Sequence, residues 1–268
     1  MKSAAQTFDA ILADQRRSAL RGAGLVSLVV AACVAALAAT GFFDAQRFIE
    51  SGPAISTLAS EMVPPDFGRW RTWIRPLLDT LEMSIAGTAL AVVFSLPLAL
   101  LAAPNTSPHP AVYLAVRTLL AFLRSVPEII LGVLFVAAVG FGALPGVLAL
   151  ALHSIGMVGK FYAEAIEHVD PKPLEAARAA GATPMQVIMH AVLPQVLPQL
   201  TDVTIYRWEY HFRASAVLGI VGAGGIGFEL IAALRLLNYD QVSAILLSIL
   251  ACVVMVDSVG AYLRKSLK

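Results

Sequence analysis

The chain has 268 residues, of which 58% are hydrophobic and only 14% are charged. Soluble globular domains carry about 25% charged residues, so most of this surface is not built to face water. The net charge of +1 excludes the strongly basic field expected of a nucleic-acid-binding protein. No stretch shows the alternating ten-residue pattern of an outer-membrane barrel, which excludes that class as well.

Six apolar segments are each long enough to cross about 30 Å of hydrocarbon. Because the backbone of a lipid-facing segment must satisfy its own hydrogen bonds, each segment is predicted to be a helix. The expected fold is therefore all-α, a polytopic membrane helical bundle with about six transmembrane helices. We expect a cytoplasmic N-terminal segment at residues 1–21 and a single transmembrane domain at 22–268. The predicted spans are residues 22–43, 77–103, 112–141, 143–168, 190–219 and 240–263.

The third predicted span is interrupted near its middle. Pro127 lacks a backbone donor and disfavours helical geometry at Val126. We therefore expect a short interfacial helix, a break near Ser125, and the span proper from Glu128 onward.

The placement of lysine and arginine predicts the orientation. Six spans put both ends on one side, and both ends are basic, so both termini and the connection at 169–194 are predicted to be cytoplasmic. The expected location is the bacterial cytoplasmic membrane. The loop at 44–76 argues against this orientation, because its arginines would lie outside. The residues concerned are Lys2, Arg16, Arg17, Arg21, Arg264, Lys265 and Lys268 at the ends, and Arg47, Arg69, Arg71 and Arg75 in the loop.

The connection at 169–194 carries the capping signals of two short helices. Asp170 suits the N-cap of the first helix, and Gly181 supplies a left-handed residue where that helix should end. Thr183 begins the second helix, with Gln186 three residues later to complete a capping box. The sequence therefore predicts two helices joined at a glycine elbow. These signals alone are equally compatible with a surface hairpin that has no partner.

The same connection resembles the cytoplasmic EAA loop of ABC importer permeases. That pattern reads EAA, three residues, Gly, nine residues, Ile, one residue, Leu-Pro, and here only the isoleucine position departs, as Ala191. The resemblance covers about residues 77–268 and implies the MetI-like ABC permease fold, in which this loop is a coupling helix seated on a nucleotide-binding subunit. It assigns ATPase coupling to Glu175, Ala176, Ala177, Gly181, Leu193 and Pro194.

A narrower likeness is to the phosphonate permeases of this family. It implies cargo of the phosphonate type or a related phosphate-like anion. The strings that carry it are Arg124 to Glu128, Met157 to Lys160, Arg207 to Arg213, Leu218 to Gly227 and Pro64 to Phe67.

Arg207, Glu209 and Arg213 lie inside the fifth predicted span. Each charge there costs about 2.5–3.5 kcal/mol on insertion scales, so these side chains are expected to face the bundle interior, a partner subunit or water. One interpretation is a translocation pathway, because arginine matches the oxygen geometry of phosphoryl groups. The other is a structural ion pair between Glu209 and one of the arginines that holds two copies together. Arg124 is a further candidate for a pathway or interhelical charge.

A glycine cluster formally matches the dinucleotide-binding motif G-x-G-x-x-G. That motif requires a preceding strand and a following helix in a βαβ unit, and the chain shows no such alternation. We expect instead a flexible turn at the outer end of the fifth span. Its candidate gate-hinge residues are Gly222, Gly224, Gly225 and Gly227.

The chain is predicted to be a permease subunit and not an enzyme. No G-x-x-x-x-G-K-[ST] motif occurs, so we expect ATP and Mg to bind a partner ATPase and this chain to hold no cofactor. No catalytic residue and no metal site are expected, because the histidines and the two cysteines lack ligand spacing.

The resemblance also implies an assembly. The expected partners are a second permease copy in a homodimer, two ATP-binding subunits at the 169–194 loops, and a periplasmic or lipid-anchored solute-binding protein near the 44–76 loop and the 222–240 turn. Two alternatives stay open. One is a type I ABC permease for an amino acid such as methionine. The other is an ion-coupled secondary transporter, although the internal repeats common in that class are not visible.

Overall fold

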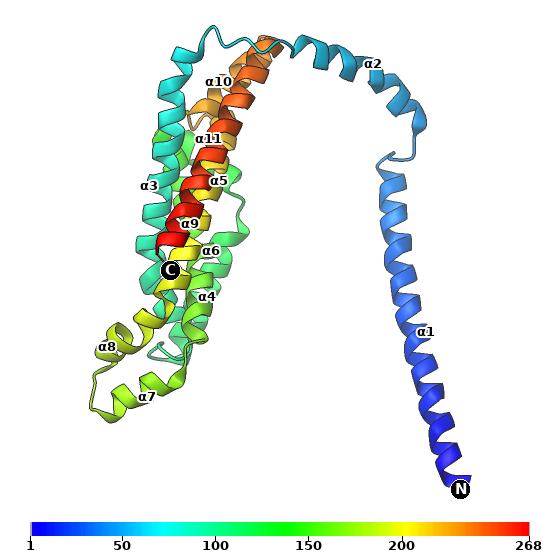
Figure 1. Ribbon diagram of the computed structural model, residues 1–268, viewed down its shortest axis with the longest axis vertical. Helices are drawn as coiled ribbons and strands as arrows, with labels where there is room; N and C mark the ends of the chain where they lie inside the picture. The colour runs from blue at the N-terminus through cyan, green and yellow to red at the C-terminus, as the bar shows by residue number, and fades with distance from the viewer. Residues whose placement is uncertain (1, 268) are drawn as a thin grey trace. The chain divides into compact units, whose positions relative to one another are not determined.

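The computed structural model describes residues 2–267, and side chains from residue 14 onward; this range contains helices and turns and no strand (Figure 1). The all-α prediction is confirmed. The α-helices are α1 (Lys2–Ala39), α2 (Ala45–Glu61), α3 (Trp70–Ala102), α4 (Pro110–Ser125), α5 (Glu128–Val139), α6 (Ala143–Glu167), α7 (Pro171–Ala179), α8 (Pro184–Val187), α9 (Leu193–Leu218), α10 (Ile226–Arg235) and α11 (Tyr239–Ser266). A π-helical segment, η1 (Ile188–Val192), precedes α9, and a 3₁₀ turn, η2 (Gly219–Val221), follows it.

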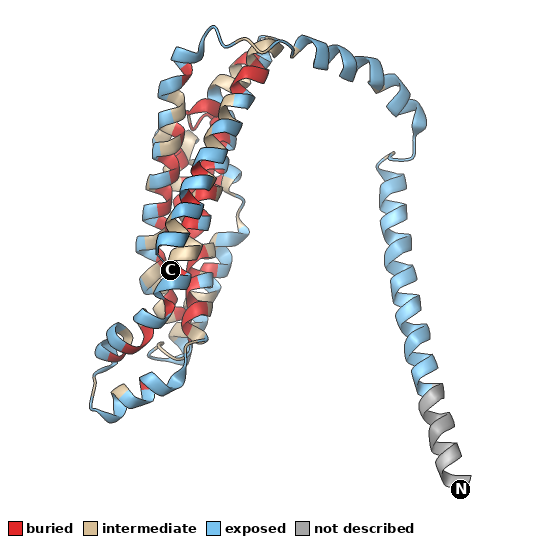
Figure 2. Cartoon of the chain, viewed as in Figure 1, coloured by how far each residue is buried: buried red, intermediate tan, exposed pale blue. Residues whose placement is uncertain are grey.

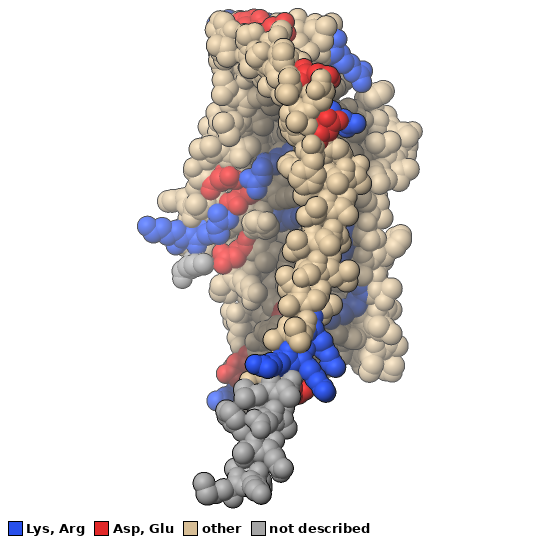
Figure 3. Space-filling model, turned by 90° about the vertical axis from the view of Figure 1, so that its right-hand side faces the viewer, with Lys and Arg blue, Asp and Glu red and all other residues tan. Residues whose placement is uncertain are grey.

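The chain divides into two compact units at Ser60. The first unit holds α1 and nearly all of α2, and none of its described side chains is buried (Figure 2). Figure 3 shows the apolar part of α1 as a column free of charged side chains, with arginines gathered toward its start. Such a helix needs lipid or another protein around it. The sequence placed residues 22–60 in one domain with the remainder, and the structure groups them in this first unit.

The number of helices that could cross a membrane agrees with the prediction of about six. Four single helices are long and apolar enough: residues 14–39 of α1, and α3, α6 and α11. Two bent pairs bring the number to six. They are α4 with α5, bent by 82°, and the helical run Pro184–Val221 with α10, bent by 44°.

The break predicted in the third span is confirmed. Helix α4 ends at Ser125 and α5 begins at Glu128, because Pro127 cannot continue the helical hydrogen bonding. The carbonyl of Val126 is left free by the break and accepts a hydrogen bond from Nδ1 of His153 on α6, at 2.9 Å. A polar group from the neighbouring helix thus compensates for the interrupted backbone.

Several predicted boundaries are wrong. The loop expected at 44–76 contains α2, and α3 begins at Trp70 instead of residue 77. The turn expected at 222–240 contains α10. Helix α2 is less apolar than most of the spans and α10 is only 10 residues long, so hydropathy alone grouped them with the connections.

The core of the second unit extends along its bundle (Figure 2). One cluster of buried side chains lies beside α7 and α8 and includes Tyr162 and Ile166. Another includes Trp73, Ile226 and Ile245, from α3, α10 and α11. Helices approach closely where α6 carries small residues: a Cβ added to Gly156 would lie 2.6 Å from the Leu120 carbonyl oxygen of α4. Such small-residue contacts are typical of helices packed in membranes.

Candidate coupling elbow and buried arginine site

The elbow at 169–194 is built by the caps that the sequence predicts. Asp170 caps α7 by accepting a hydrogen bond from the Lys172 N–H at 3.0 Å. Gly181 has φ of +82°, the left-handed conformation that ends the turn at low cost. Thr183 and Gln186 form the full capping box, with the Thr183 N–H 2.8 Å from Gln186 Oε1. These local features are confirmed.

The second half of the elbow differs from the prediction. Helix α8 continues through the π-helical segment Ile188–Val192 directly into α9, so the elbow and the fifth span form one continuous helical run. Leu193 and Pro194 therefore lie in the first turn of α9. Proline is tolerated there because the preceding turn, η1, does not require the hydrogen bond that a backbone N–H at residue 194 would donate.

The six predicted coupling residues fall into two groups. Glu175, Ala176, Gly181 and Pro194 are exposed, while Ala177 and Leu193 pack in part against the core. Leu174, which is only 5% exposed, anchors α7 to that core. A partner protein could reach the first group directly, and the second group fixes the angle at which the elbow leaves the bundle.

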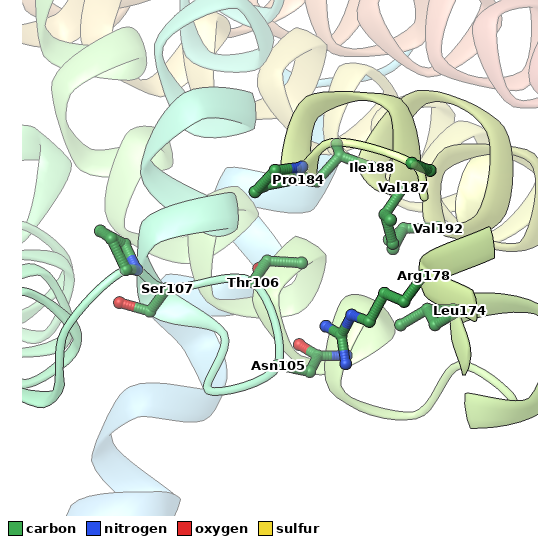
Figure 4. A pocket seen from close by; sticks show the side chains of 11 residues that line it. Asn105, Thr106, Ser107, Leu174, Arg178, Pro184, Val187, Ile188 and Val192 are labelled. Carbon is green, nitrogen blue, oxygen red and sulfur yellow. The ribbon is translucent and has the colours of Figure 1, made fainter. Parts of the chain in front are cut away.

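A cavity of about 460 Å³ lies between the elbow and the α3–α4 connection (Figure 4). One wall is polar and includes Asn105, whose Nδ2 donates to the Ile166 carbonyl at 2.6 Å. The opposite wall includes apolar side chains such as Val187 and Val192, and Arg178 of α7 extends toward Asn105. The elbow thus faces a second connection across this cavity, which has room for a side chain of another protein.

A second polar site lies inside the bundle, around Arg207 of α9. Its Nε donates to Ser154 Oγ of α6 at 2.8 Å, and its guanidinium lies 4.3 Å from the centre of the Tyr210 ring. Nη2 is 3.8 Å from Oε2 of Glu128, at the start of α5. The Tyr210 hydroxyl donates to the other oxygen of Glu128. The break before α5 therefore brings a carboxylate to a buried arginine.

A hydrogen-bonded chain extends from Arg207 to α3. Ser154 lies 2.6 Å from Nε2 of His211, and Nδ1 of His211 lies 2.7 Å from Thr88 Oγ1. Thr88 in turn donates to the Ser84 carbonyl at 2.7 Å. Because Thr88 uses its proton there, it accepts from Nδ1–H, and Nε2 accepts from Ser154, whose oxygen accepts from Arg207. These bonds are all satisfied when Nδ1 of His211 carries a proton and Nε2 accepts.

Within the described chain, Glu209 pairs with neither Arg207 nor Arg213. Glu209 pairs with Arg264 of α11, with Nη1 and Oε1 2.8 Å apart, and Arg213 pairs with Asp257 of α11 at 3.0 Å. Residues two or six positions apart leave a helix in different directions, so the three charges meet different neighbours. These two ion pairs join α9 to α11.

Arg124 does not join this site. It is exposed and lines a separate cavity of about 90 Å³, together with Arg117, Lys160 and Glu164. Its position at the end of α4 explains this, because the break turns the chain before α5 begins.

Sequence reasoning did not assign the partners of Arg207, Glu209 and Arg213. The signal for Glu128 was present, because an ionisable residue inside an apolar run is a candidate functional group. The neutral partners gave no comparable signal. The residues missed are Thr88, Glu128, Ser154, Tyr210, His211, Asp257 and Arg264.

The glycine turn lies between η2 and α10. Gly222, Gly224 and Gly225 have positive φ, whereas Gly227 does not. A Cβ on Gly227 would lie 1.8 Å from the Ala216 carbonyl oxygen, so this glycine serves the close packing of α10 on α9. A gate-hinge role for the four residues stays a prediction.

The family of the chain follows from comparison with known proteins. Residues 95–268 match the family described as binding-protein-dependent transport system inner membrane component. The chain belongs to this family. Its members are permease components, so the chain is a multi-pass protein of the inner membrane.

Curated relatives in this permease family include a phosphite transport system permease protein, PtxC, of Stutzerimonas stutzeri. It is 62% identical to this chain, over 97% of both chains. A phosphate-import permease protein, PhnE, of Mycolicibacterium smegmatis is 43% identical over 84% of this chain and 42% of that protein. A probable D-methionine permease, MetI, of Haemophilus influenzae is 25% identical over 70% of this chain and 93% of that protein.

Solved structures confirm the predicted MetI-like fold of this permease. An inward-facing structure of the MetNI methionine ABC transporter matches with a TM-score of 0.67, covering 76% of this chain and 99% of that chain, at 22% identity. A likeness at that identity concerns the fold alone.

Proposed function

We propose that this chain is the membrane permease subunit of an ATP-driven importer for a small phosphorus oxyanion of the phosphite or phosphonate class. The observation that carries the proposal is the 62% identity, over 97% of both chains, to a phosphite transport permease. The buried Arg207 supports it, because a guanidinium inside a membrane bundle offers charge to an anion.

Energy enters this importer through the elbow. A separate ATPase, which holds ATP and Mg, contacts the exposed surface of α7 that includes Glu175 and Ala176, with the elbow on the cytoplasmic side and both termini cytoplasmic. The exposed Met185 and Met189 add adaptable apolar contacts. This chain itself binds no cofactor.

The assembly contains two permease chains and a solute-binding protein on the outer face. A second copy of this chain is the proposed permease partner. Related systems argue for a variant of this arrangement, because Stutzerimonas stutzeri has two putative phosphite permeases, HtxC and HtxE, that are 39% and 36% identical to this chain. Two different permeases in one transporter are therefore the alternative.

Uptake by cells tests the function. The gene would be deleted and restored on a plasmid, and uptake of ³³P-phosphite, methylphosphonate and labelled methionine would be measured in glycolysing cells with and without a protonophore. We expect the deletion to abolish uptake of one of the phosphorus anions, and the protonophore to leave the restored uptake intact.

The other outcomes identify the alternatives. Loss of methionine uptake alone would indicate an amino acid permease. Loss of phosphite uptake on adding the protonophore, while ATP is sustained by glycolysis, would indicate an ion-coupled secondary transporter.

A further inference from the structure

A cavity of about 200 Å³ lies beside α9, at the polar site around Arg207. Its polar lining consists of His153, Tyr206, Arg207 and Tyr210, and the remaining lining is apolar. One water molecule takes about 30 Å³ in the liquid, so the cavity has room for a small ligand and a few waters. A few polar groups that converge on an otherwise apolar cavity are typical of a ligand site.

Arg207 is hydrogen-bonded on one side and lacks a hydrogen-bond partner on the other. Its side chain is 5% exposed, and within residues 2–267 its one hydrogen bond runs from Nε to Ser154. Nη2 is buried and has no hydrogen-bond partner in the described chain. An unsatisfied buried donor costs about 1–3 kcal/mol, and a charged one costs more. The guanidinium therefore has a buried donor for which the described chain supplies no acceptor.

Glu128 compensates for the charge of Arg207 only in part. Its Oε2 lies 3.8 Å from Nη2, which is too far for a hydrogen bond, and is buried without a partner among the described residues. Its Oε1 accepts from Tyr210. The carboxylate lowers the cost of burying Arg207 while leaving the donor free.

We propose that this cavity is a transient binding subsite for a small tetrahedral phosphorus oxyanion, with Arg207 as its charged partner and Glu128 as a competitor for Arg207. The inference rests on the proposed function. The guanidinium fork matches the oxygens of such an anion, and the hydroxyl of Tyr206 adds a donor, whereas the hydroxyl of Tyr210 is occupied by Glu128. Both tyrosines neighbour Arg207 on α9, so one rigid helix positions all three groups.

Competition from Glu128 for Arg207 keeps the affinity of the subsite for its anion moderate, as transport requires. A site on a permeation path must bind well enough to admit its cargo and weakly enough to release it. Glu128 attracts Arg207 when the cavity is empty and repels the anion when it is filled. A dianion is attracted about twice as strongly as a monoanion by Arg207 and repelled about twice as strongly by Glu128, so Glu128 cancels the advantage that Arg207 alone would give to sulfate.

Equilibrium dialysis tests the subsite without transport. The full chain, reconstituted in nanodiscs with its ATPase subunits, would be dialysed against ³³P-phosphite or ³⁵S-sulfate near neutral pH. Arg207→Gln should weaken phosphite binding at least tenfold. Glu128→Gln should tighten it several-fold and reduce the preference for phosphite over sulfate. Arg213→Gln is the matched control on the same helix, because Arg213 does not line the cavity, and its binding should equal that of the wild type.

Each outcome decides for or against the subsite. Unchanged binding in Arg207→Gln, weaker binding in Glu128→Gln, or no retention of phosphite by the wild type would overturn it. A misfolded variant cannot bind more tightly, so the result with Glu128→Gln does not depend on whether Arg207→Gln folds. Failure of the proposed function would look different, because cells that lack the gene would then take up both phosphite and methylphosphonate normally whatever the dialysis shows.

Discussion

The elbow and the polar interior of α9 are stabilised in opposite ways. In the elbow, each cap joins residues two or three positions apart and is exposed to solvent. In the interior, Ser154 and Arg207 are 53 positions apart, and Thr88 and His211 are 123 apart. Water can replace a lost cap, whereas a lost interior partner leaves a buried polar group unpaired. Single substitutions should therefore affect stability most in the interior, and affect function without loss of the fold in the elbow.

The ion pair between Glu209 and Arg264 should give the largest loss of stability. The Glu209 side chain is 8% exposed, and Arg264 is its one ion-pair partner in the described chain. Arg264→Leu would leave a buried carboxylate without its counter-charge, so the free energy of unfolding should fall by about 3–5 kcal/mol. Unfolding in mixed detergent micelles, titrated with a denaturing detergent, measures this change.

The control for this ion pair is the double variant. Glu209→Gln combined with Arg264→Leu removes both charges and should recover most of the lost free energy, because no ion then stays unpaired. A loss below about 1 kcal/mol in the single variant would contradict the comparison. It would mean that Glu209 finds solvent or another partner as readily as an exposed elbow residue does.

Gly181→Val should have the next largest effect, and on transport more than on the fold. No atom lies within 4 Å of an added Cβ, so the cost comes from the positive φ, about 1–3 kcal/mol for a residue held in that region. We expect normal membrane insertion and loss of transport, because the elbow would turn at a different angle. Membrane fractionation and uptake of the labelled anion measure the two effects.

Asparagine is the matched substitution at this position, because it tolerates the left-handed conformation. Gly181→Asn should keep most of the transport. Wild-type uptake in Gly181→Val would remove the coupling role from this turn, and loss of insertion would show that the elbow supports the fold after all.

The same contrast explains what the sequence could predict. The caps at Asp170, Gly181 and Thr183 depend on residues close in the chain, and the break at Pro127 depends on one residue and its neighbour. These features were therefore predicted correctly. The number of spans was predictable because each span carries its own apolar signal. The helices α2 and α10 were missed because they lie in stretches that hydropathy assigned to connections between spans.

The interior pairs could not be predicted in this way. The charges on α9 indicate that partners must exist, but helical periodicity does not identify the neighbouring helix that supplies them. Glu209 meets Arg264 because α11 packs along α9, and Arg207 meets Glu128 because the break turns α5 toward it. Both depend on tertiary packing. The neutral members Ser154 and Thr88 are ordinary helix residues until His211 is placed between them.

The smallest effect is expected from the capping box. Thr183→Ala removes the acceptor for the Gln186 N–H, 3.4 Å from Thr183 Oγ1, and should destabilise the start of α8 by about 1 kcal/mol. Hydrogen exchange of the amides of residues 185–187 should become faster, while uptake stays within about twofold of the wild type. Thr183→Ser keeps the acceptor and should leave exchange unchanged. A large loss of transport in Thr183→Ala would mean that transport depends on the rigidity of α8 and not only on the angle set at Gly181. Because α8 and α9 form one continuous helical run, a rigid α8 would transmit movement of the elbow directly into α9.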